Sequence, residues 1–474
     1  MNDTVINAGE GTATASLATL VQLAGLPAAA ADAVEITGAD PVFPTRYKIV
    51  APGAACIAAT GLAAADLWAL KTGRQQRVRV EGRAAAAAMR GSRYLKINGA
   101  RPPEDPEKIT GFYPLKDGRW MYLHCNFFNL RDRNLEVLGA PLQKAAVEKA
   151  VAKWDGLDLE DAIVNAGGCA CLVRSEEEWR ALPQMHTVAR LPLLEIIKIG
   201  EAPPLPLPDG DRPLAGVRVL DLTRVLAGPT CARTLAEHGA DVLRVTREDL
   251  ADMGPTDFDT GVGKLCTHID LRKPAEEATM RELIKTCDVF SQSYRPGTLA
   301  RRGFSPEALA EMRPGIVYVT LSAWGHEGPW AARRGYDTIV QSANGMAYRP
   351  NNERPEFLPV SEQDYVAGYL LAYGTMVALG RRVREGGSWF VRVSLAGAGH
   401  FIRGHGLIKP AEYEKVAKEL PADELKALMV EHDSPIGRVT NLAPVVQMSE
   451  TPARWARPAV PRGYHPPVWP ERAA

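Results

Sequence analysis

The chain has 474 residues, of which 46% are apolar and 24% charged, a composition typical of a globular protein with two or three domains. Lys plus Arg and Asp plus Glu each number 56, so no net charge favours nucleic acid or an anionic membrane as a partner. The seven cysteines are scattered without a Cys-x-x-Cys pair, which predicts reduced thiols in a cytoplasmic protein and argues against a zinc site. No cationic N-terminal start and no run near about 18 apolar residues occurs, so we expect neither a signal peptide nor a membrane span.

Two regions precede a proline-rich segment. Residues 1–60 are rich in alanine and glycine, with helical patterns around 16–23 and 58–70, and a short strand follows at 78–80. Residues 99–200 predict a compact separate unit, with a hairpin around Asp117-Gly118, several helices, and a capping box from Ser175 to Glu178. Residues 201–213 hold five prolines and read as an extended linker.

Beyond the linker, strands alternate with helices. Buried strand patterns lie at 217–222, 241–245, 288–291 and 316–321, with helical patterns between them. Such a βαβ series predicts a parallel sheet covered by helices. Ligands of these sheets bind beyond the carboxyl ends of the strands, so we expect four loops to gather at the site, namely 223–229, 246–249, 293–297 and 322–329.

Common nucleotide and hydrolase motifs are missing from this series. The sequence has no G-x-G-x-x-G after the first strand, no P-loop, no G-x-S-x-G elbow and no H-E-x-x-H pair. The predicted loops instead carry arginines, which either bind phosphate groups through their two-pronged guanidinium or are simple surface charges. These arginines are Arg224, Arg247, Arg295, Arg301, Arg302, Arg333 and Arg334.

One carboxylate, Asp364, stands at the start of a long apolar helical pattern over 365–384, which a Gly-Gly break and a strand at 389–395 follow. By composition alone Asp364 is a helix N-cap, because Asp accepts hydrogen bonds from the free N–H groups of a first turn.

The sequence also contains a weak internal repeat. A shift of 313 positions aligns 78–80 with 391–393 and places Ala51 opposite Asp364, although Ala-rich sequence also produces such matches by chance.

Several motifs occur in an order that resembles the class III coenzyme A-transferases, the CaiB/BaiF family. They are Leu214 to Pro229, Gly239-Ala240-Asp241-Val242, Tyr294-Arg295-Pro296-Gly297, Gly335-Tyr336-Asp337 and Asp364-x-x-x-Gly368. The resemblance implies an α/β fold with a Rossmann-like, CoA-binding large domain and a smaller α+β domain. In these terms, the chain divides into a degenerate large-domain fragment (1–98), a small domain (99–200), the linker (201–213), a CoA-binding catalytic domain (214–410) and a C-terminal return segment (411–474). Since family members are intertwined dimers, the resemblance predicts a homodimer or a pseudo-dimer within one chain.

The resemblance also implies a chemistry. Asp364 would attack an acyl-CoA thioester to form a mixed anhydride, and CoA would return to give an aspartyl-CoA thioester that a carboxylic acid then accepts. No metal is needed, and we expect the carboxylate to be ionised at neutral pH. The predicted CoA contacts are the backbone of Val225 and Ala227 together with the side chains of Arg247, Arg301, Arg334 and Tyr336.

Two alternatives stay open. An α-methylacyl-CoA racemase needs a second acid or base, usually His at the position of Tyr336, and a neutral Tyr is a poor base near pH 7. A non-catalytic acyl-CoA-binding subunit is suggested by Ala51 in the degenerate copy. The family's glycine-rich loop has only a weak substitute here, Ala166-Gly167-Gly168.

Overall fold

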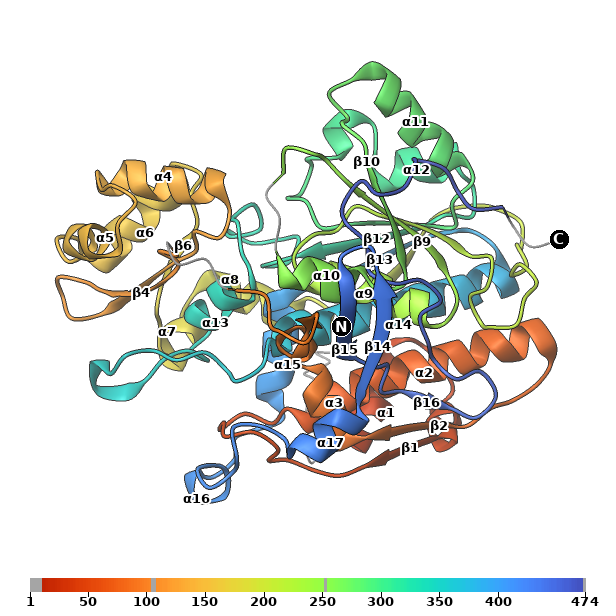
Figure 1. Ribbon diagram of the computed structural model, residues 1–474, viewed down its shortest axis with the longest axis horizontal. Coiled ribbons are helices and arrows are strands. Elements are labelled where there is room, and N and C mark those ends of the chain that lie inside the picture. Colours follow the sequence, from red (N-terminus) through yellow and green to blue (C-terminus); the bar gives the residue numbers. More distant parts are fainter. Residues whose placement is uncertain (1–10, 104–107, 251–253, 472–474) are drawn as a thin grey trace.

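The computed structural model describes residues 11–103, 108–250 and 254–471, and its centre is a seven-stranded sheet in the order β10-β9-β8-β11-β12-β13-β7 (Figure 1). The strands are β7 Glu195–Gly200, β8 Arg218–Asp221, β9 Asp241–Thr246, β10 Lys264–His268, β11 Val289–Gln292, β12 Val317–Ser322 and β13 Ser388–Ser394. All neighbours are parallel except β7, which pairs antiparallel with β13 at one edge. The order reverses between β8 and β11, which confirms the predicted Rossmann-like sheet.

Helices cover both faces of this sheet. They are α9 Ala227–Glu237 and α14 Glu362–Glu385 on one face, and α11 Pro274–Lys285 and α12 Pro306–Met312 on the other. Successive strand residues point to opposite faces, so Val317 and Val319 join the core beneath α14 whereas Tyr318 joins the core beneath α12. Burial on both faces explains why the strands are continuously apolar in sequence.

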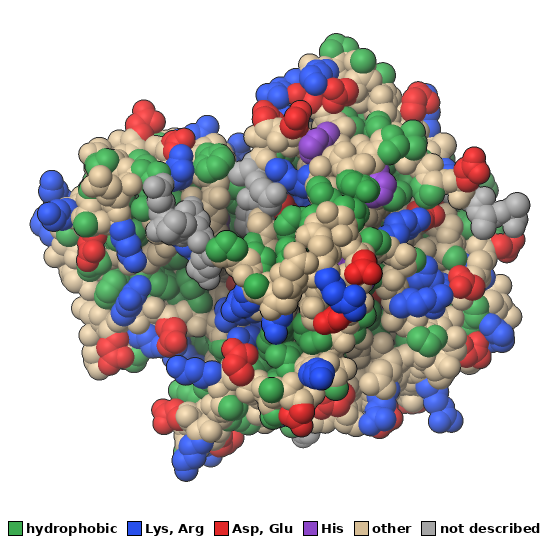
Figure 2. Space-filling model, in the orientation of Figure 1, with side chains coloured by type: hydrophobic (Ala, Val, Ile, Leu, Met, Phe, Trp, Pro, Cys, Tyr) green, Lys and Arg blue, Asp and Glu red, His purple; other side chains and the backbone are tan. Residues whose placement is uncertain are grey.

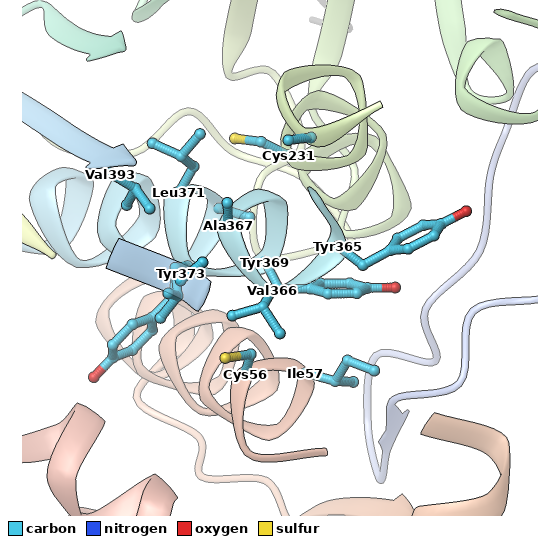
Figure 3. Packing of buried hydrophobic residues seen from close by; sticks show 14 of the residues in the cluster. Cys56, Ile57, Cys231, Tyr365, Val366, Ala367, Tyr369, Leu371, Tyr373 and Val393 are labelled. Carbon is cyan, nitrogen blue, oxygen red and sulfur yellow. The ribbon is translucent and has the colours of Figure 1, made fainter. Parts of the chain in front are cut away.

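Helix α14 is the central helix of the molecule. Figure 3 shows it between α9, which presents Cys231, and α2 (Val50–Thr72), which presents Cys56 and Ile57. The helix begins at Glu362, earlier than the apolar pattern predicts, with Ser361 at the N-cap. Asp364 is therefore the third residue of the first turn and not the cap.

The N-terminal region packs beside α14 as a smaller layer. It comprises α1 Ala13–Leu23, η2 Ala28–Ala33, β1 Val34–Thr37, α2, β2 Val78–Glu81, α3 Gly82–Ala88, η3 Gly91–Tyr94 and β3 Lys96–Ile97. Its three-stranded sheet has the order β1-β2-β16, in which β16 (Gln447–Met448) comes from the C-terminal region. Within the described residues, α2 alone is long and apolar enough to cross a membrane, but 83% of its most apolar window is buried, as in a core helix.

The small unit has its own core and stands apart from the main sheet (Figure 1). It contains β4 Gly111–Pro114, β5 Trp120–Leu123, β6 Ala170–Leu172, α4 Phe128–Leu138, α5 Lys144–Val151 and α6 Gly156–Asn165. The predicted hairpin joins β4 to β5, and the predicted capping box of Ser175 and Glu178 starts α7 (Glu176–Arg180). After α8 (Pro183–Arg190) the chain returns to the main sheet as β7, ahead of the proline-rich segment.

The remaining helices and strands lie between and after these units. They are α10 Pro255–Gly261, η4 Ala300–Arg302, α13 Asp337–Ala343, η5 Pro350–Asn352, α15 Leu395–Gly404, α16 Pro410–Tyr413, α17 Ala422–Ala427, β14 Met429–Ser434 and β15 Gly437–Leu442. The seven cysteines are free and buried. On the face in Figure 2, cationic and anionic side chains are interspersed, consistent with the zero net charge.

Candidate active site

A cavity of about 490 Å³ lies at the carboxyl ends of β8, β9, β11 and β12. The loop after each of these strands contributes lining residues, among them Arg224, Arg247, Tyr294 and Ser322. This confirms that the four predicted loops gather in one place. The cavity includes the point between β8 and β11 where the strand order reverses, which is the usual ligand position in an open α/β sheet.

Six of the seven predicted site residues line this cavity, namely Asp364, Val225, Ala227, Arg247, Arg334 and Tyr336. Arg301 does not. The chain turns at Gly297, whose φ is 75°, and enters η4, where the Arg301 side chain is exposed outside the lining. Arg295, which lies before the turn, lines the cavity in its stead.

Asp364 lies on the cavity wall because α14 approaches α9 closely. A Cβ atom on Gly368, one turn after Asp364, would lie 2.6 Å from the backbone oxygen of Ala227 and 2.8 Å from Cβ of Thr230. Residues four apart share one face of a helix, so the glycine and the aspartate both face the start of α9. The Asp-x-x-x-Gly spacing therefore brings the carboxyl to the cavity, where it remains 7% exposed.

The loop between β8 and α9 is held in an unusual conformation. Val225 has a φ of 74°, which costs a β-branched residue roughly 1–3 kcal/mol. Asp221 fixes the loop, since its Oδ1 accepts hydrogen bonds from the Thr223 N–H at 3.0 Å and hydroxyl at 2.5 Å. Buried Lys264 donates to Asp221 Oδ2 and to the Pro229 carbonyl, both at 2.9 Å. This buried pair escaped the sequence analysis because its partners are far apart in the chain.

The N-terminus of α9 is suited to an anion. No side chain caps the helix, and its first backbone bond runs from the Thr230 N–H to the Leu226 carbonyl at 2.8 Å. The N–H groups of Ala227 and Gly228 precede that bond, at the positive end of the helix dipole and beside the cavity. The predicted backbone contacts at Val225 and Ala227 thus have a physical basis.

The surroundings of Asp364 favour its protonated form. Burial raises the pKa of Asp364 well above its ordinary value, and the neighbouring carboxyl of Asp337 raises that pKa further. Asp337 is itself buried, with its pKa raised to about 6 by burial, and it accepts hydrogen bonds from Gln341 at 2.7 Å and Gln363 at 3.1 Å. The free site therefore holds a proton on Asp364 more tightly than a solvated carboxylate would.

Five arginines line the cavity, namely Arg224, Arg247, Arg295, Arg333 and Arg334. Arg334 donates from Nε to the carbonyl of Gly167 at 3.0 Å, so the Gly167-Gly168 segment does lie next to the site. Arg333 faces Glu160 at 3.8 Å and Asp161 at 3.5 Å, whereas Arg247 pairs with Asp249. This concentration of guanidinium groups suits a ligand with several phosphates.

From the CoA-binding role that the sequence predicts, replacing Arg334 by glutamine should raise the KM for an acyl-CoA about tenfold or more, because a charge-assisted hydrogen bond contributes roughly 1.5–3 kcal/mol. Steady-state kinetics with the donor varied would measure this change. Arg301→Gln is the matched control, since Arg301 lies outside the cavity and its KM should stay within about twofold of the native value. Equal losses in the two variants would contradict the placement of Arg301.

The small unit supplies a wall that the sequence analysis missed, formed by Phe127, Phe128 and Asn129. The ring of Tyr336 stacks on His124, at 4.0 Å between ring centroids, and also contacts Phe127, at 5.6 Å. Burial lowers the pKa of His124 to about 3 and raises the pKa of Tyr336, so both rings are neutral. His124 lies behind Tyr336 and does not line the cavity. Only the adjacent aromatics Phe127 and Phe128 could have signalled this wall.

Over residues 11–103, 108–250 and 254–471, the structure has no group of three or more His, Cys, Asp or Glu side chains placed to hold a metal ion.

Comparisons with known proteins bear on the region that contains this cavity. Residues 214–422 match the family model of CoA-transferase family III. An acyl-CoA transferase of Gibberella moniliformis is 30% identical over 317 residues, which cover 61% of this chain and 55% of that protein. The succinyl-CoA:glutarate CoA-transferase of Mus musculus is 34% identical over 202 residues, covering 40% of this chain and 46% of that protein. The chain spans about half the length of these curated relatives.

The Mycobacterium tuberculosis protein Rv3272 is 29% identical with a TM-score of 0.38, over 40% of this chain and 57% of that chain. A CAIB/BAIF family protein from Brucella suis is 24% identical with a TM-score of 0.38, over 48% of this chain and 65% of that chain. Asp364 and the predicted CoA contacts all fall within residues 214–422, the part of the chain that matches CoA-transferase family III.

Proposed function

We propose that this protein transfers coenzyme A from an acyl-CoA to a carboxylic acid, with Asp364 as the covalent carrier. The observation that carries the proposal is the pairing of one buried carboxyl with five arginines in a single cavity. The arginines suit the phosphates of CoA, and the carboxyl is a nucleophile for its thioester. The relatives named as CoA-transferases support the same reaction class.

The proposed reaction proceeds through anhydride and thioester intermediates, and each bond that forms is matched by one that breaks. A carboxylate oxygen of Asp364 attacks the thioester carbon, the C–S bond breaks, and CoA leaves as a thiolate while a mixed anhydride forms. The thiolate then attacks the aspartyl carbonyl and releases the donor carboxylate, which leaves an aspartyl-CoA thioester. An acceptor carboxylate attacks this thioester and forms a second anhydride. CoA thiolate attacks the acceptor's carbonyl of that anhydride, giving the new acyl-CoA and free Asp364.

Each attack places negative charge on a carbonyl oxygen. The N–H groups of Ala227 and Gly228, which no side chain caps, are the donors we propose for such an oxyanion, and they directly follow the loop that holds Val225 at a positive φ. The nucleophile must be ionised, so its raised pKa predicts that the rate of acylation rises with pH as Asp364 loses its proton.

The cavity lining disfavours the racemase. Proton exchange at the α-carbon needs a second acid or base, yet Tyr336 has a raised pKa and His124 lies behind it. Among the described residues that line the cavity there is no His, Lys, Cys or Glu, and the second carboxylate, Asp249, is paired with Arg247.

Trapping the acylated aspartate tests the proposal. The protein is incubated with a pool of acyl-CoAs and hydroxylamine, and peptides are analysed by mass spectrometry. We expect a hydroxamate on Asp364, lost in Asp364→Asn but retained in Asp249→Asn, which alters the other carboxylate of the cavity. Solvent deuterium at the acyl α-carbon without an adduct would identify a racemase instead. CoA binding without either signal would identify a non-catalytic subunit.

A further inference from the structure

The units on the two sides of α14 share one order of elements. Helix α2, strand β2 and helix α3 follow one another as α14, β13 and α15 do. A shift of 313 positions aligns the last residue of α2, Thr72, with the last residue of α14, Glu385. The same shift aligns the last residue of β2 with that of β13, and the first residue of α3 with that of α15. Chance similarity of Ala-rich sequence does not produce coinciding element bounds.

The strand pairing repeats as well. Strand β2 lies between a parallel neighbour, β1, and an antiparallel one, β16, with Val78 opposite Met448. Strand β13 lies between parallel β12 and antiparallel β7, with Val391 opposite Ile196. Val78 and Val391 are 313 positions apart, so both the type and the register of pairing coincide.

Helix α2 packs on strand β2 in the same way as helix α14 packs on strand β13. A Cβ atom on Gly61 of α2 would lie 2.6 Å from Cγ1 of Val78. One on Gly374 of α14 would lie 2.8 Å from Cγ1 of Val391. Each helix rests on its strand through a glycine at the matching position, so residues 34–88, here called the first copy, repeat the unit that carries Asp364.

The first copy differs at the reacting position. Ala51 matches Asp364, and the N–H groups at the start of α2 are already bonded. Oδ1 of Asp40 accepts from Ile49 at 2.7 Å and Val50 at 2.9 Å, and Oδ2 accepts from Ala51 at 3.0 Å. No side-chain hydrogen bond caps α14, so a carboxylate of the protein closes the start of α2 but not that of α14.

The segment that follows the first copy holds the first turn of α14 on both sides of Asp364. The N–H of Ser361 donates to the carbonyl of Met89 at 3.0 Å. The N–H of Ser92 donates to the hydroxyl oxygen of buried Tyr365 at 2.9 Å. Residues 361 and 365 flank Asp364, so its position on the cavity wall depends on contacts from residues 89–92.

We propose that the first copy is a non-catalytic counterpart of the unit that carries Asp364 and packs against that unit as a structural partner within the same chain. We propose further that Tyr365 is a positioning residue for Asp364. Each chain then forms a single acyl-enzyme, at Asp364. The inference rests on the proposed function insofar as Asp364 carries the acyl group.

The test compares two tyrosines of α14. Tyr365→Phe removes the acceptor of the Ser92 bond next to Asp364. The control, Tyr373→Phe, removes another buried hydroxyl that donates to the N-terminal region, to the Leu20 carbonyl at 3.2 Å, two turns away from Asp364. We expect Tyr365→Phe to lower kcat about tenfold or more while the KM for acyl-CoA changes less than about twofold, since small misplacement of a reacting group is costly. The control should keep both constants within about twofold.

Hydrogen exchange gives a readout that does not depend on activity. Amides 362–368 should exchange faster in Tyr365→Phe than in the native protein or in Tyr373→Phe, at similar melting temperatures. Native kcat together with native exchange in Tyr365→Phe would overturn the positioning role. Two hydroxamates per chain would show that the first copy is also catalytic and would overturn the proposal. Absence of any adduct on native Asp364 would refute the proposed function, while the exchange comparison would still decide the role of Tyr365.

Discussion

Replacing Asp364 by asparagine should abolish transfer, lowering kcat by roughly 10⁴-fold or more, because an amide cannot form the acyl anhydride. Transfer of CoA to a labelled carboxylic acid measures the loss. Binding of CoA should change less than about threefold, since the five arginines of the cavity are untouched. Retention of more than a few per cent of native kcat would rule out Asp364 as the carrier.

The same variant should be more stable than the native protein near neutral pH. In the unfolded chain the Asp364 carboxyl has a pKa near 4, whereas folding raises that pKa, so the ionised form destabilises the fold. Asparagine removes this cost, which we expect to increase the free energy of unfolding. The gain should shrink as the pH falls toward the unfolded pKa, where both states hold the proton. Urea unfolding of both proteins at pH 5 and 7.5 measures the difference.

Replacing Gly368 by alanine should have the second largest effect. The new Cβ atom would lie 2.6 Å from the backbone oxygen of Ala227, which cannot turn aside as a flexible side chain can. Helix α14 must therefore move away from α9 and carry Asp364, one turn earlier, off the cavity wall. We expect kcat to fall about 10- to 100-fold and the free energy of unfolding to fall by roughly 1–3 kcal/mol.

Gly380→Ala is the matched control in the same helix. Its Cβ atom would lie 2.9 Å from Nη1 of Arg384, the far end of a flexible side chain. Since alanine is the better helix former by about 1 kcal/mol, this variant should be as stable as the native protein or more so, with native kcat. Native kinetics in Gly368→Ala would contradict the close approach of the two helices.

Local patterns predicted much of the architecture because the main sheet is built from consecutive strands and helices. Strand β12 lies within one residue of its predicted bounds, 316–321, and the four predicted loops meet at one cavity. The start of α14 was misplaced, since polar residues 362 and 363 interrupt the apolar pattern although they are helical and buried.

The candidate site was harder to predict than the fold, because its geometry depends on tertiary contacts. Arg247 and Arg334 line the cavity as predicted, but the turn at Gly297 moves Arg301 out of it. The Lys264–Asp221 pair and the wall at Phe127 join segments far apart in the chain, which no local pattern encodes. The raised pKa of Asp364 depends on its burial beside Asp337, a property of the folded state alone.

The pairing of β16 with β2 has a consequence for synthesis on the ribosome. The N-terminal sheet β1-β2-β16 spans residues 34–448, so it stays incomplete until most of the chain has emerged. Until then β2 presents an unpaired edge, the kind of surface that recruits other strands and leads to aggregation. Contacts so distant in sequence also form slowly, because closing a long loop costs chain entropy before any contact is gained. Strands β1 and β2, although synthesised long before β16, are thus among the last elements to reach their final structure, and a nascent chain that stalls before β16 would depend on chaperones.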